Sequence, residues 1–254
     1  MTERHEIILC STPRSGSTLL AEAMYATRLL GCPDEYFNND QNHKGDRDQT
    51  IMEQNWTTLG AGGFLDYCDR LHGHYASPNG VHSIKMHFKH FKGALAQGYF
   101  RRDVPRSFVW IRRRDKVAQA ASLAIAIKTQ KWNSRMASSV SGDVEVPDEL
   151  LARCYRDLIF DDLRWEAYFG MFGIVPLDFE YDGIVADLAG CLDRIALGAG
   201  VRLPPEALAQ VEGRISGKKL SGGLNAQLMA RLSGMRIEDF GPGNILHDTG
   251  TLTG

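Results

Sequence analysis

The chain has 254 residues, and its 29 Lys and Arg residues against 31 Asp and Glu residues give a formal net charge of −2. Because these charges nearly balance, whole-chain electrostatics give no reason to expect nucleic acid or an anionic membrane as a partner. Five scattered cysteines without a C-x-x-C pair argue against a disulfide framework and a cysteine zinc site. The charged N-terminus has no secretory signal, and no apolar stretch approaches the ~20 residues that span a bilayer, so we expect a soluble cytoplasmic protein.

Apolar runs, helical periods and turn residues predict alternating strands and helices. In chain order, the predicted elements are a strand over 6–12, a helix over 17–30, a helix around 64–71, strands over 81–88 and 106–112, helices over 115–132 and 148–169, a strand over 174–179, a helix over 184–197 and two shorter helices in the tail. The segment 32–80 is otherwise polar, and His72 and His74 are interpreted as part of a solvated loop.

This alternation predicts an α/β fold, a P-loop-like three-layer sandwich with a mostly parallel sheet of about four to five strands and helices on both faces. We expect a single domain over 1–254 with an irregular tail at 241–254. Ligands of such sheets bind where the parallel strands end. The segments that follow the predicted strands are therefore expected to converge on one edge: 11–17, His87, 112–114 and Glu180.

The first of these segments reads Ser11-Thr12-Pro13-Arg14-Ser15-Gly16-Ser17-Thr18. Backbone N–H groups at the start of a helix favour an anion, Gly16 permits close approach of the backbone, and Arg14 offers a planar cation suited to tetrahedral oxyanions. The Walker A pattern G-x-x-x-x-G-K-[ST] is absent, and Cys10 lies too close to Arg14 for a cysteine-based phosphatase loop. The loop predicts a phosphate or sulfate site; an ordinary hydroxyl-rich helix start is the alternative.

A second cluster of cations follows the predicted strand over 106–112. Arg113 precedes Ser122 of the next helix by nine residues, and Arg114 precedes it by eight. A dianionic phosphate has to be matched by fixed cations and hydrogen-bond donors, which this segment offers. The alternative is a solvated basic turn followed by a tolerated helical serine.

Together the two segments resemble the signatures of sulfotransferases that use 3′-phosphoadenosine 5′-phosphosulfate (PAPS). The first is similar to the family's 5′-phosphosulfate loop, P-[KR]-[ST]-G-[ST]-T, and the second to its Arg…Ser pair for the 3′-phosphate. The resemblance implies that the 5′ end of the donor is bound by Pro13, Arg14, Ser15, Gly16, Ser17 and Thr18. It also implies that Arg113 with Ser122 binds the 3′-phosphate; the spacing to the serine in animal enzymes favours Arg114 instead.

The chain resembles most closely the bacterial carbohydrate sulfotransferases of the trehalose type, over most of its length. The residues that carry this likeness are 31–37 (GCPDEYF), Lys85, Thr129, Trp132, 164–169 and 175–181. The likeness implies transfer of a sulfuryl group from PAPS to a hydroxyl of a carbohydrate or glycolipid, without a metal, with PAP as product. We expect acceptor contacts from an insertion over 33–80. A homodimer is one assembly that fits, and the oligomeric state stays open.

Two residues are candidates for the general base that removes the acceptor's proton. Glu35 aligns with the carboxylate that has this role in the trehalose-type enzymes. His87 ends an I-K-x-H sequence similar to that of animal cytosolic sulfotransferases, whose histidine is the base, and an imidazole titrates near neutrality. Lys85 is a candidate for holding the transferred sulfate or an acceptor hydroxyl, and Arg14 for stabilising the leaving phosphate.

Two other functions stay open. A P-loop kinase is disfavoured, because the Walker lysine and a Mg²⁺-binding carboxylate after a strand are absent. A non-catalytic PAP- or nucleotide-binding protein would bind at both anion sites without turnover.

Overall fold

The computed structural model describes residues 4–40, 50–132, 144–212 and 223–240. The chain forms two compact units: unit 1 comprises Met1–Arg114 and Asp161–Gly217, and unit 2 comprises Asp115–Phe160 and Lys218–Gly254. The predicted tail at 241–254 lies outside the described residues. The prediction of a single domain, and that of an insertion for the acceptor over 33–80, stay predictions.

Unit 1 is built on a four-stranded parallel sheet with the strand order β2-β1-β3-β4. Its strands are β1 (His5–Ser11), β2 (Val81–His87), β3 (Arg106–Arg112) and β4 (Leu177–Glu180). Its helices are α1 (Ser17–Ala26), α2 (Ile51–Leu59), α3 (Phe64–Tyr75), α4 (Phe88–Ala96), η1 (Tyr99–Arg101), α7 (Tyr181–Ala186), α8 (Leu188–Gly198), α9 (Pro205–Glu212) and the part of α6 (Asp148–Phe172) from Asp161 onward. The predicted parallel α/β fold is confirmed.

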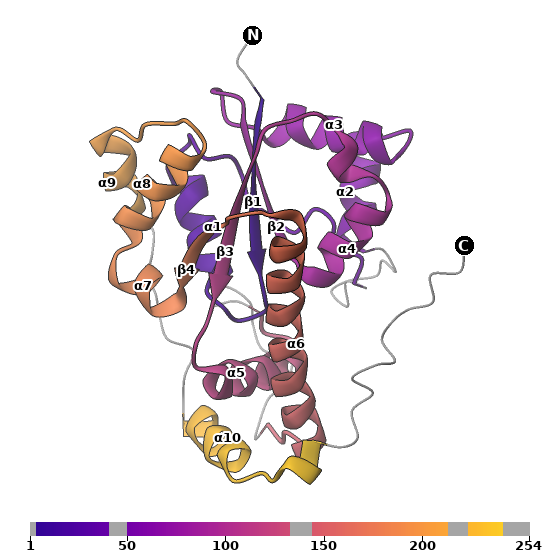
Figure 1. Cartoon of the computed structure of the whole chain (residues 1–254), viewed down its shortest axis with the longest axis vertical. Coiled ribbons are helices and arrows are strands. Elements are labelled where there is room, and N and C mark those ends of the chain that lie inside the picture. Colours follow the sequence, from indigo (N-terminus) through magenta and orange to yellow (C-terminus); the bar gives the residue numbers. More distant parts are fainter. Residues whose placement is uncertain (1–3, 41–49, 133–143, 213–222, 241–254) are drawn as a thin grey trace. The chain divides into compact units, whose positions relative to one another are not determined.

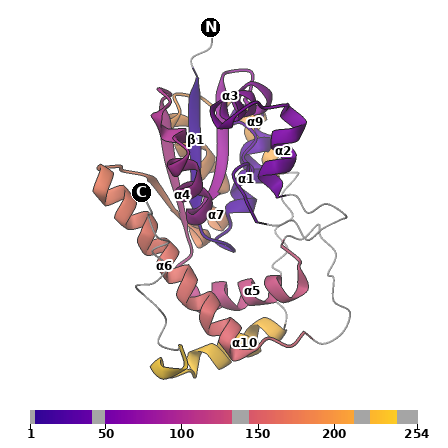
Figure 2. The same ribbon diagram turned by 90° about the vertical axis from the view of Figure 1, so that its right-hand side faces the viewer.

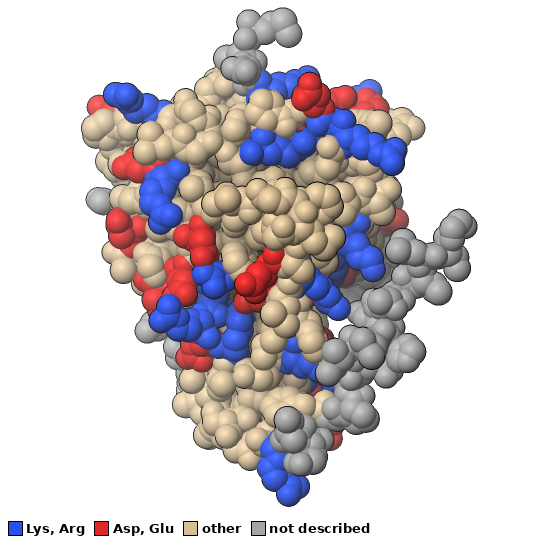
Figure 3. Space-filling view, viewed as in Figure 1, with Lys and Arg blue, Asp and Glu red and all other residues tan. Residues whose placement is uncertain are grey.

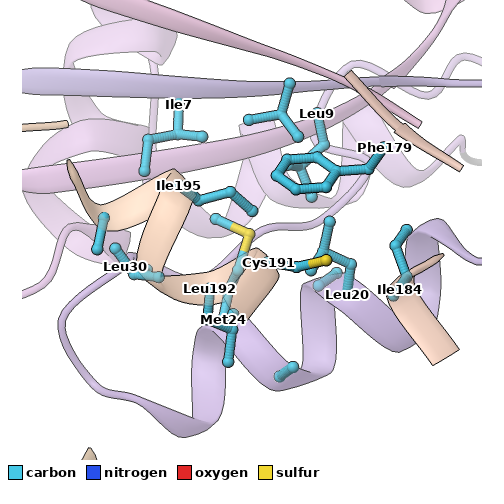
Figure 4. Packing of buried hydrophobic residues seen from close by; sticks show 14 of the residues in the cluster. Ile7, Leu9, Leu20, Met24, Leu30, Phe179, Ile184, Cys191, Leu192 and Ile195 are labelled. Carbon is cyan, nitrogen blue, oxygen red and sulfur yellow. The ribbon is translucent and has the colours of Figure 1, made fainter. Parts of the chain in front are cut away.

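Alternate residues of β1 are buried on opposite faces of the sheet, as a strand with both faces covered requires. Ile7 and Leu9 pack against α1, α7, α8 and α9, in the cluster that Figure 4 shows. Ile8 and Cys10 pack against α2, α3, α4 and the end of α6. Figure 1 shows α1 and α8 on one side of the strands and α2, α3 and α4 on the other, so the three-layer arrangement is confirmed for unit 1.

The carboxyl ends of the strands meet at one edge of the sheet. In the parallel register, Ser11 of β1 is opposite His87 of β2 and Ile111 of β3, and Arg112 of β3 is opposite Glu180 of β4. The predicted convergence of four strand ends is therefore confirmed, and ligands of parallel sheets bind at this edge.

Unit 2 holds α5 (Lys116–Thr129), the first part of α6, α10 (Gly223–Ser233) and η2 (Ile237–Phe240). Its own core is formed by apolar residues of these helices, among them Leu123, Leu158 and Leu228. In Figures 1 and 2, α5 and α10 lie side by side. Asp115 caps α5 by accepting the N–H of Ala118 at 2.8 Å, as its position predicts.

Several predicted boundaries differ from those of the structure. The first helix ends at Ala26 instead of residue 30, because the Thr27 hydroxyl donates to the Met24 carbonyl and Arg28 has a left-handed backbone with φ 62°. The predicted helix over 184–197 is two helices, separated at Asp187, whose carboxylate accepts the N–H of Gly190 and caps α8.

Two helices were not predicted at all, α2 and α4. His72 and His74 belong to α3, so their interpretation as a solvated loop was wrong, and His72 is buried. Over the described parts of the chain, none of the helices has the length and apolar character needed to cross a bilayer.

Candidate active site

The loop between β1 and α1 presents backbone N–H groups without a side-chain cap. Gly16, at the N-cap of α1, has a left-handed backbone (φ 93°) and supplies no capping side chain. Arg14 is also left-handed, with φ 64°. Ser15 is fully buried, and its hydroxyl has no hydrogen-bond partner within the described ranges. Uncapped amides at the start of a helix bind anions, so the segment Ser11–Thr18, the phosphate loop, is the candidate phosphate site.

Arg113 contacts this loop from the end of β3. Its Nη1 donates to the backbone oxygen of Arg14 at 3.4 Å, and its guanidinium carbon lies 4.9 Å from the centroid of the Tyr181 ring. Within the described part of the chain, its buried Nε has no hydrogen-bond partner. Burial and the nearby charge of Arg113 lower the pKa of Arg14 from its usual value. A bound anion would relieve this repulsion between two cations.

The neighbouring arginines point to carboxylates instead. Arg114 is exposed and pairs with Glu180 at 3.1 Å, while Arg112 pairs with Asp178. On the face shown in Figure 3, Lys and Arg side chains lie among Asp and Glu side chains. Of these three consecutive arginines, Arg113 is the one that turns to the phosphate loop.

The other residues predicted for donor binding are placed as follows. Pro13 is half-buried, Ser17 is buried, and Thr18 is exposed in the first turn of α1. Ser122 lies on α5 in unit 2 and Arg113 in unit 1, so their joint role stays a prediction.

Glu35 is placed beside the ends of β1 and β2 by its own backbone segment. The preceding residue, Asp34, forms a parallel bridge with Ile84, and its carbonyl accepts the N–H of Lys85 at 3.0 Å. The segment therefore runs along the outer side of β2. This main-chain contact explains why a loop residue comes to lie against two strand residues.

Three side chains surround the Glu35 carboxylate. Lys85 Nζ lies 3.0 Å and His87 Nε2 3.4 Å from its Oε1, and Asn38 Nδ2 donates to its Oε2 at 2.6 Å. Lys85 Nζ also donates to Thr18 Oγ1 at 3.4 Å, so this ammonium lies between the carboxylate and the phosphate loop. Burial on its own would raise the pKa of Glu35, but Lys85 and His87 outweigh it and hold that pKa well below 4.5.

The contacts of His87 restrict where its protons lie. Its Nδ1 is 3.3 Å from Ser11 Oγ and 3.2 Å from Ser11 O, and its Nε2 faces Glu35. An ionised carboxylate can only accept, so a hydrogen bond from His87 to Glu35 requires a proton on Nε2. In the neutral ring, Nδ1 then accepts the Ser11 hydroxyl; in the charged ring, Nδ1 donates to Ser11 O. In both arrangements the proton of Nε2 faces the carboxylate, so Nε2 has no lone pair to offer there.

Sequence reasoning missed Asn38 and Tyr181. Trp165, at the end of α6 that belongs to unit 1, is a core residue whose side chain is fully buried. Its Nε1 donates to Ser11 O at 3.3 Å, the same carbonyl that lies 3.2 Å from His87 Nδ1. For Asn38 the one available signal was its position three residues after Glu35, a turn spacing at which side chains of neighbouring residues can meet.

A different cluster consists of Glu6, His72 and His82, and it is buried near the amino ends of β1 and β2. The potential metal-ligand atoms of these residues lie within 4.8 Å of one another. Both oxygens of Glu6 are already held, by Arg102 at 2.8 Å and by Arg106 at 2.9 Å. A cation bound here would face two guanidinium groups, so we assign no metal to these residues.

Comparison with known proteins identifies the family of this chain. The model of the family described as Stf0 sulphotransferase matches residues 6–96 and 95–231, which is most of the chain. The chain belongs to the Stf0 sulphotransferase family. It is therefore a transferase enzyme, and its phosphate loop, Glu35, Lys85 and Arg113 all lie within the matched residues.

This sulphotransferase is similar to two curated relatives. It is 26% identical over 238 residues to "Trehalose 2-sulfotransferase" of Mycobacterium tuberculosis, with 80% of this chain and 88% of the relative covered. It is 25% identical over 237 residues to the protein of the same name from Mycolicibacterium smegmatis, with the same shares covered. Among solved structures, it is similar to sulfotransferase STF9 from Mycobacterium avium, at 12% identity and a TM-score of 0.49 over 91% of this chain and 76% of that one.

Proposed function

We propose that this sulphotransferase transfers a sulfuryl group from PAPS to a hydroxyl of a carbohydrate or glycolipid, without a metal. The observation that carries the proposal is the placement of Glu35 and Lys85 beside the phosphate loop, with Lys85 3.0 Å from the carboxylate and 3.4 Å from Thr18. Two mycobacterial relatives named trehalose 2-sulfotransferase support a carbohydrate as the acceptor.

In the proposed reaction, the acceptor oxygen attacks the sulfur of PAPS. The bond between that sulfur and the bridging phosphate oxygen breaks, and PAP leaves with the electron pair. The amides of the loop and Arg14 stabilise the leaving phosphate, while Glu35 takes the proton of the acceptor hydroxyl. Arg113 offers a cation for the 3′-phosphate, and its buried Nε, which has no hydrogen-bond partner among the described residues, supports this role.

The position of Lys85 suggests how a weakly basic carboxylate becomes effective. While Lys85 pairs with Glu35, the pKa of Glu35 is held low. Its contact with Thr18 puts the same ammonium within reach of an anion in the loop. A sulfuryl group bound there would draw Lys85 from Glu35, and the loss of this partner raises the pKa of the carboxylate.

A direct test compares PAP with ATP and Mg²⁺ as ligands, and radiolabelled PAPS as donor to trehalose and other sugars. At 100 times its dissociation constant, PAP should stabilise the fold by about 2.7 kcal/mol, and ATP with Mg²⁺ much less. Equal stabilisation by both ligands would indicate a phosphoryl-transfer enzyme. Stabilisation by PAP without sulfate transfer to any sugar would indicate a nucleotide-binding protein or an acceptor of another class.

The cytoplasmic location and the homodimer stay predictions. Analytical ultracentrifugation of the full chain, with and without PAP, measures the oligomeric state directly.

A further inference from the structure

The amide of Asn38 is hydrogen-bonded at both ends. Its Nδ2 donates to Glu35 Oε2 at 2.6 Å, and its Oδ1 accepts the backbone N–H of Asp40 at 2.8 Å. Turning the amide over would place Oδ1 against a carboxylate oxygen and Nδ2 against an N–H group, so these contacts allow one orientation. Asn38 is 7% exposed, and its amide nitrogen is aimed at the carboxylate.

The backbone of Asn38 is also fixed. Its N–H donates to the Glu35 carbonyl at 2.9 Å, and its carbonyl accepts the N–H of Met52 in α2 at 3.0 Å. The side chain therefore projects from a turn that is tied to a helix on one side and to Glu35 on the other. A donor held in this way restricts rotation of the carboxylate about its last torsion, which is otherwise broad.

The two oxygens of Glu35 have different surroundings as a result. Oε2 meets the amide of Asn38, whereas Oε1 meets Lys85 and His87. Lys85 in turn contacts Thr18 in the first turn of α1, so Oε1 is the oxygen on the side of the phosphate loop.

We propose that Asn38 is a positioning residue, which holds Oε2 of Glu35 and leaves Oε1 as the oxygen that takes the proton of the acceptor. This inference rests on the proposed function, since it assumes that Glu35 is the general base. Asn38 itself stays outside the reaction, because both of its polar atoms are engaged.

Two effects follow when the amide is removed. The carboxylate gains freedom to rotate, so fewer complexes present Oε1 to the hydroxyl and kcat falls. A hydrogen bond to the charged form of a carboxylate lowers its pKa, so the loss of this bond raises the pKa of Glu35. The acidic limb of the pH–kcat profile then moves to higher pH, a change that a merely structural role of Asn38 does not produce.

The test uses Asn38→Ala and Asn38→Asp, with Asn225→Ala as the matched control. Asn225 lies in α10 of unit 2, is 9% exposed and donates from Nδ2 to Met229 Sδ at 3.8 Å. We expect Asn38→Ala to lower kcat roughly 10- to 100-fold, as for a reacting group that is misplaced by about 1 Å. Binding of PAP should be unchanged, the acidic limb should shift upward, and Asn38→Asp should shift it further, because a second carboxylate opposes ionisation of Glu35. Asn225→Ala should behave as wild type.

A double variant separates this inference from the proposed function. Adding Asn38→Ala to Glu35→Gln should cause no further loss of kcat, because no base remains to be positioned. If Asn38→Ala raises the KM of the acceptor and leaves the pH profile in place, the amide contacts the acceptor and the inference is wrong. If Glu35→Gln and Asn38→Ala each keep a wild-type kcat, Glu35 is not the base and the proposed mechanism itself fails. Circular dichroism and thermal melts of each variant identify any loss that comes from unfolding, and Asn38→Asp, which keeps the shape of the side chain, then decides the outcome.

Discussion

Lys85 and Glu35 form an ion pair with 3.0 Å between Nζ and Oε1, and only 10% and 19% of their side chains are exposed. A pair at this depth contributes to stability as well as to chemistry, because breaking it leaves a carboxylate that water solvates poorly. The nearby pair of Lys89 and Asp40 is different, since 57% of each of its side chains is exposed.

We expect Lys85→Met to lower the free energy of unfolding by about 3 kcal/mol at pH 7. Lys89→Met, the matched control, should cost less than about 1 kcal/mol. Because the folded pKa of Glu35 is depressed, the stability from this pair is present above pH 4.5 and is lost as the pH falls through the folded value. Urea unfolding at several pH values should therefore show a deficit for Lys85→Met that shrinks toward acid. A deficit that is independent of pH would mean that packing of the lysine stem dominates.

The assignment of the base predicts unequal effects at Glu35 and His87. Glu35→Gln keeps the shape of the side chain but cannot accept a proton, so kcat should fall by roughly 10²–10⁴-fold while PAP affinity stays nearly unchanged. His87→Asn should cost much less, because an Nε2 that donates to the carboxylate has no lone pair for the acceptor's proton. Single-turnover sulfate transfer and PAP titrations measure both quantities. A near-wild-type Glu35→Gln together with an inactive, folded His87→Asn would assign the chemistry to the histidine.

The orientation of the arginines after β3 predicts which one binds the donor. Arg113→Ala should weaken donor binding by roughly 1.5–3 kcal/mol, the usual value of a charge-assisted hydrogen bond. Arg114→Ala should have little effect, because Arg114 is exposed and paired with Glu180. Calorimetric titration with PAP and with a donor analogue that lacks the 3′-phosphate is the measurement. The defect of Arg113→Ala should shrink with the analogue; an equal defect would place Arg113 at the 5′ end.

His82 predicts an acid-sensitive fold, independent of activity. Burial lowers its pKa from 6.5 to about 3, helped by the nearby His72. The unfolded chain therefore binds a proton at a higher pH than the folded chain, and stability falls as the pH drops below 6.5. Between pH 7 and pH 5 the loss from this group is about 2 kcal/mol. His82→Leu should remove this loss, and the exposed His74→Asn should not. Unfolding curves at both pH values test this, and an unchanged acid loss in His82→Leu would move its origin to other groups.

The sequence was sufficient for the features that depend on local pattern. The strand, loop and helix from His5 to Ala26 follow from apolar runs and turn residues, and the convergence of the strand ends follows from the parallel sheet. The start of α2 could also have been found. Thr50 and Glu53 form a capping box, whose side chains bond to each other's backbone N–H at 3.1 Å and 2.7 Å, and the T-x-x-E spacing is readable in the sequence.

The contacts within the site could not be predicted in the same way. Glu35 and His87 are 52 positions apart in the chain, and the bridge of Asp34 to β2 brings their side chains to 3.4 Å from each other. The sequence offered Glu35 and His87 as separate candidates for the base. In the structure their side chains are in contact. The ring of Tyr181 is likewise placed by the strand order, which sets β4 beside β3 and thus the ring beside Arg113.

That ring has a consequence for how the protein can vary over evolution. A Cβ at Gly16 would lie 2.6 Å from Cδ2 of Tyr181, and the backbone of Gly16 is left-handed as well. A side chain at position 16 therefore requires both a strained backbone and a smaller residue at position 181. Loss of the aromatic ring at 181 would in turn leave the guanidinium of Arg113 without the surface it lies on. Positions 16, 113 and 181, far apart in the chain, should consequently vary together among related proteins. A protein in which one of them alone has changed should bind the proposed donor more weakly.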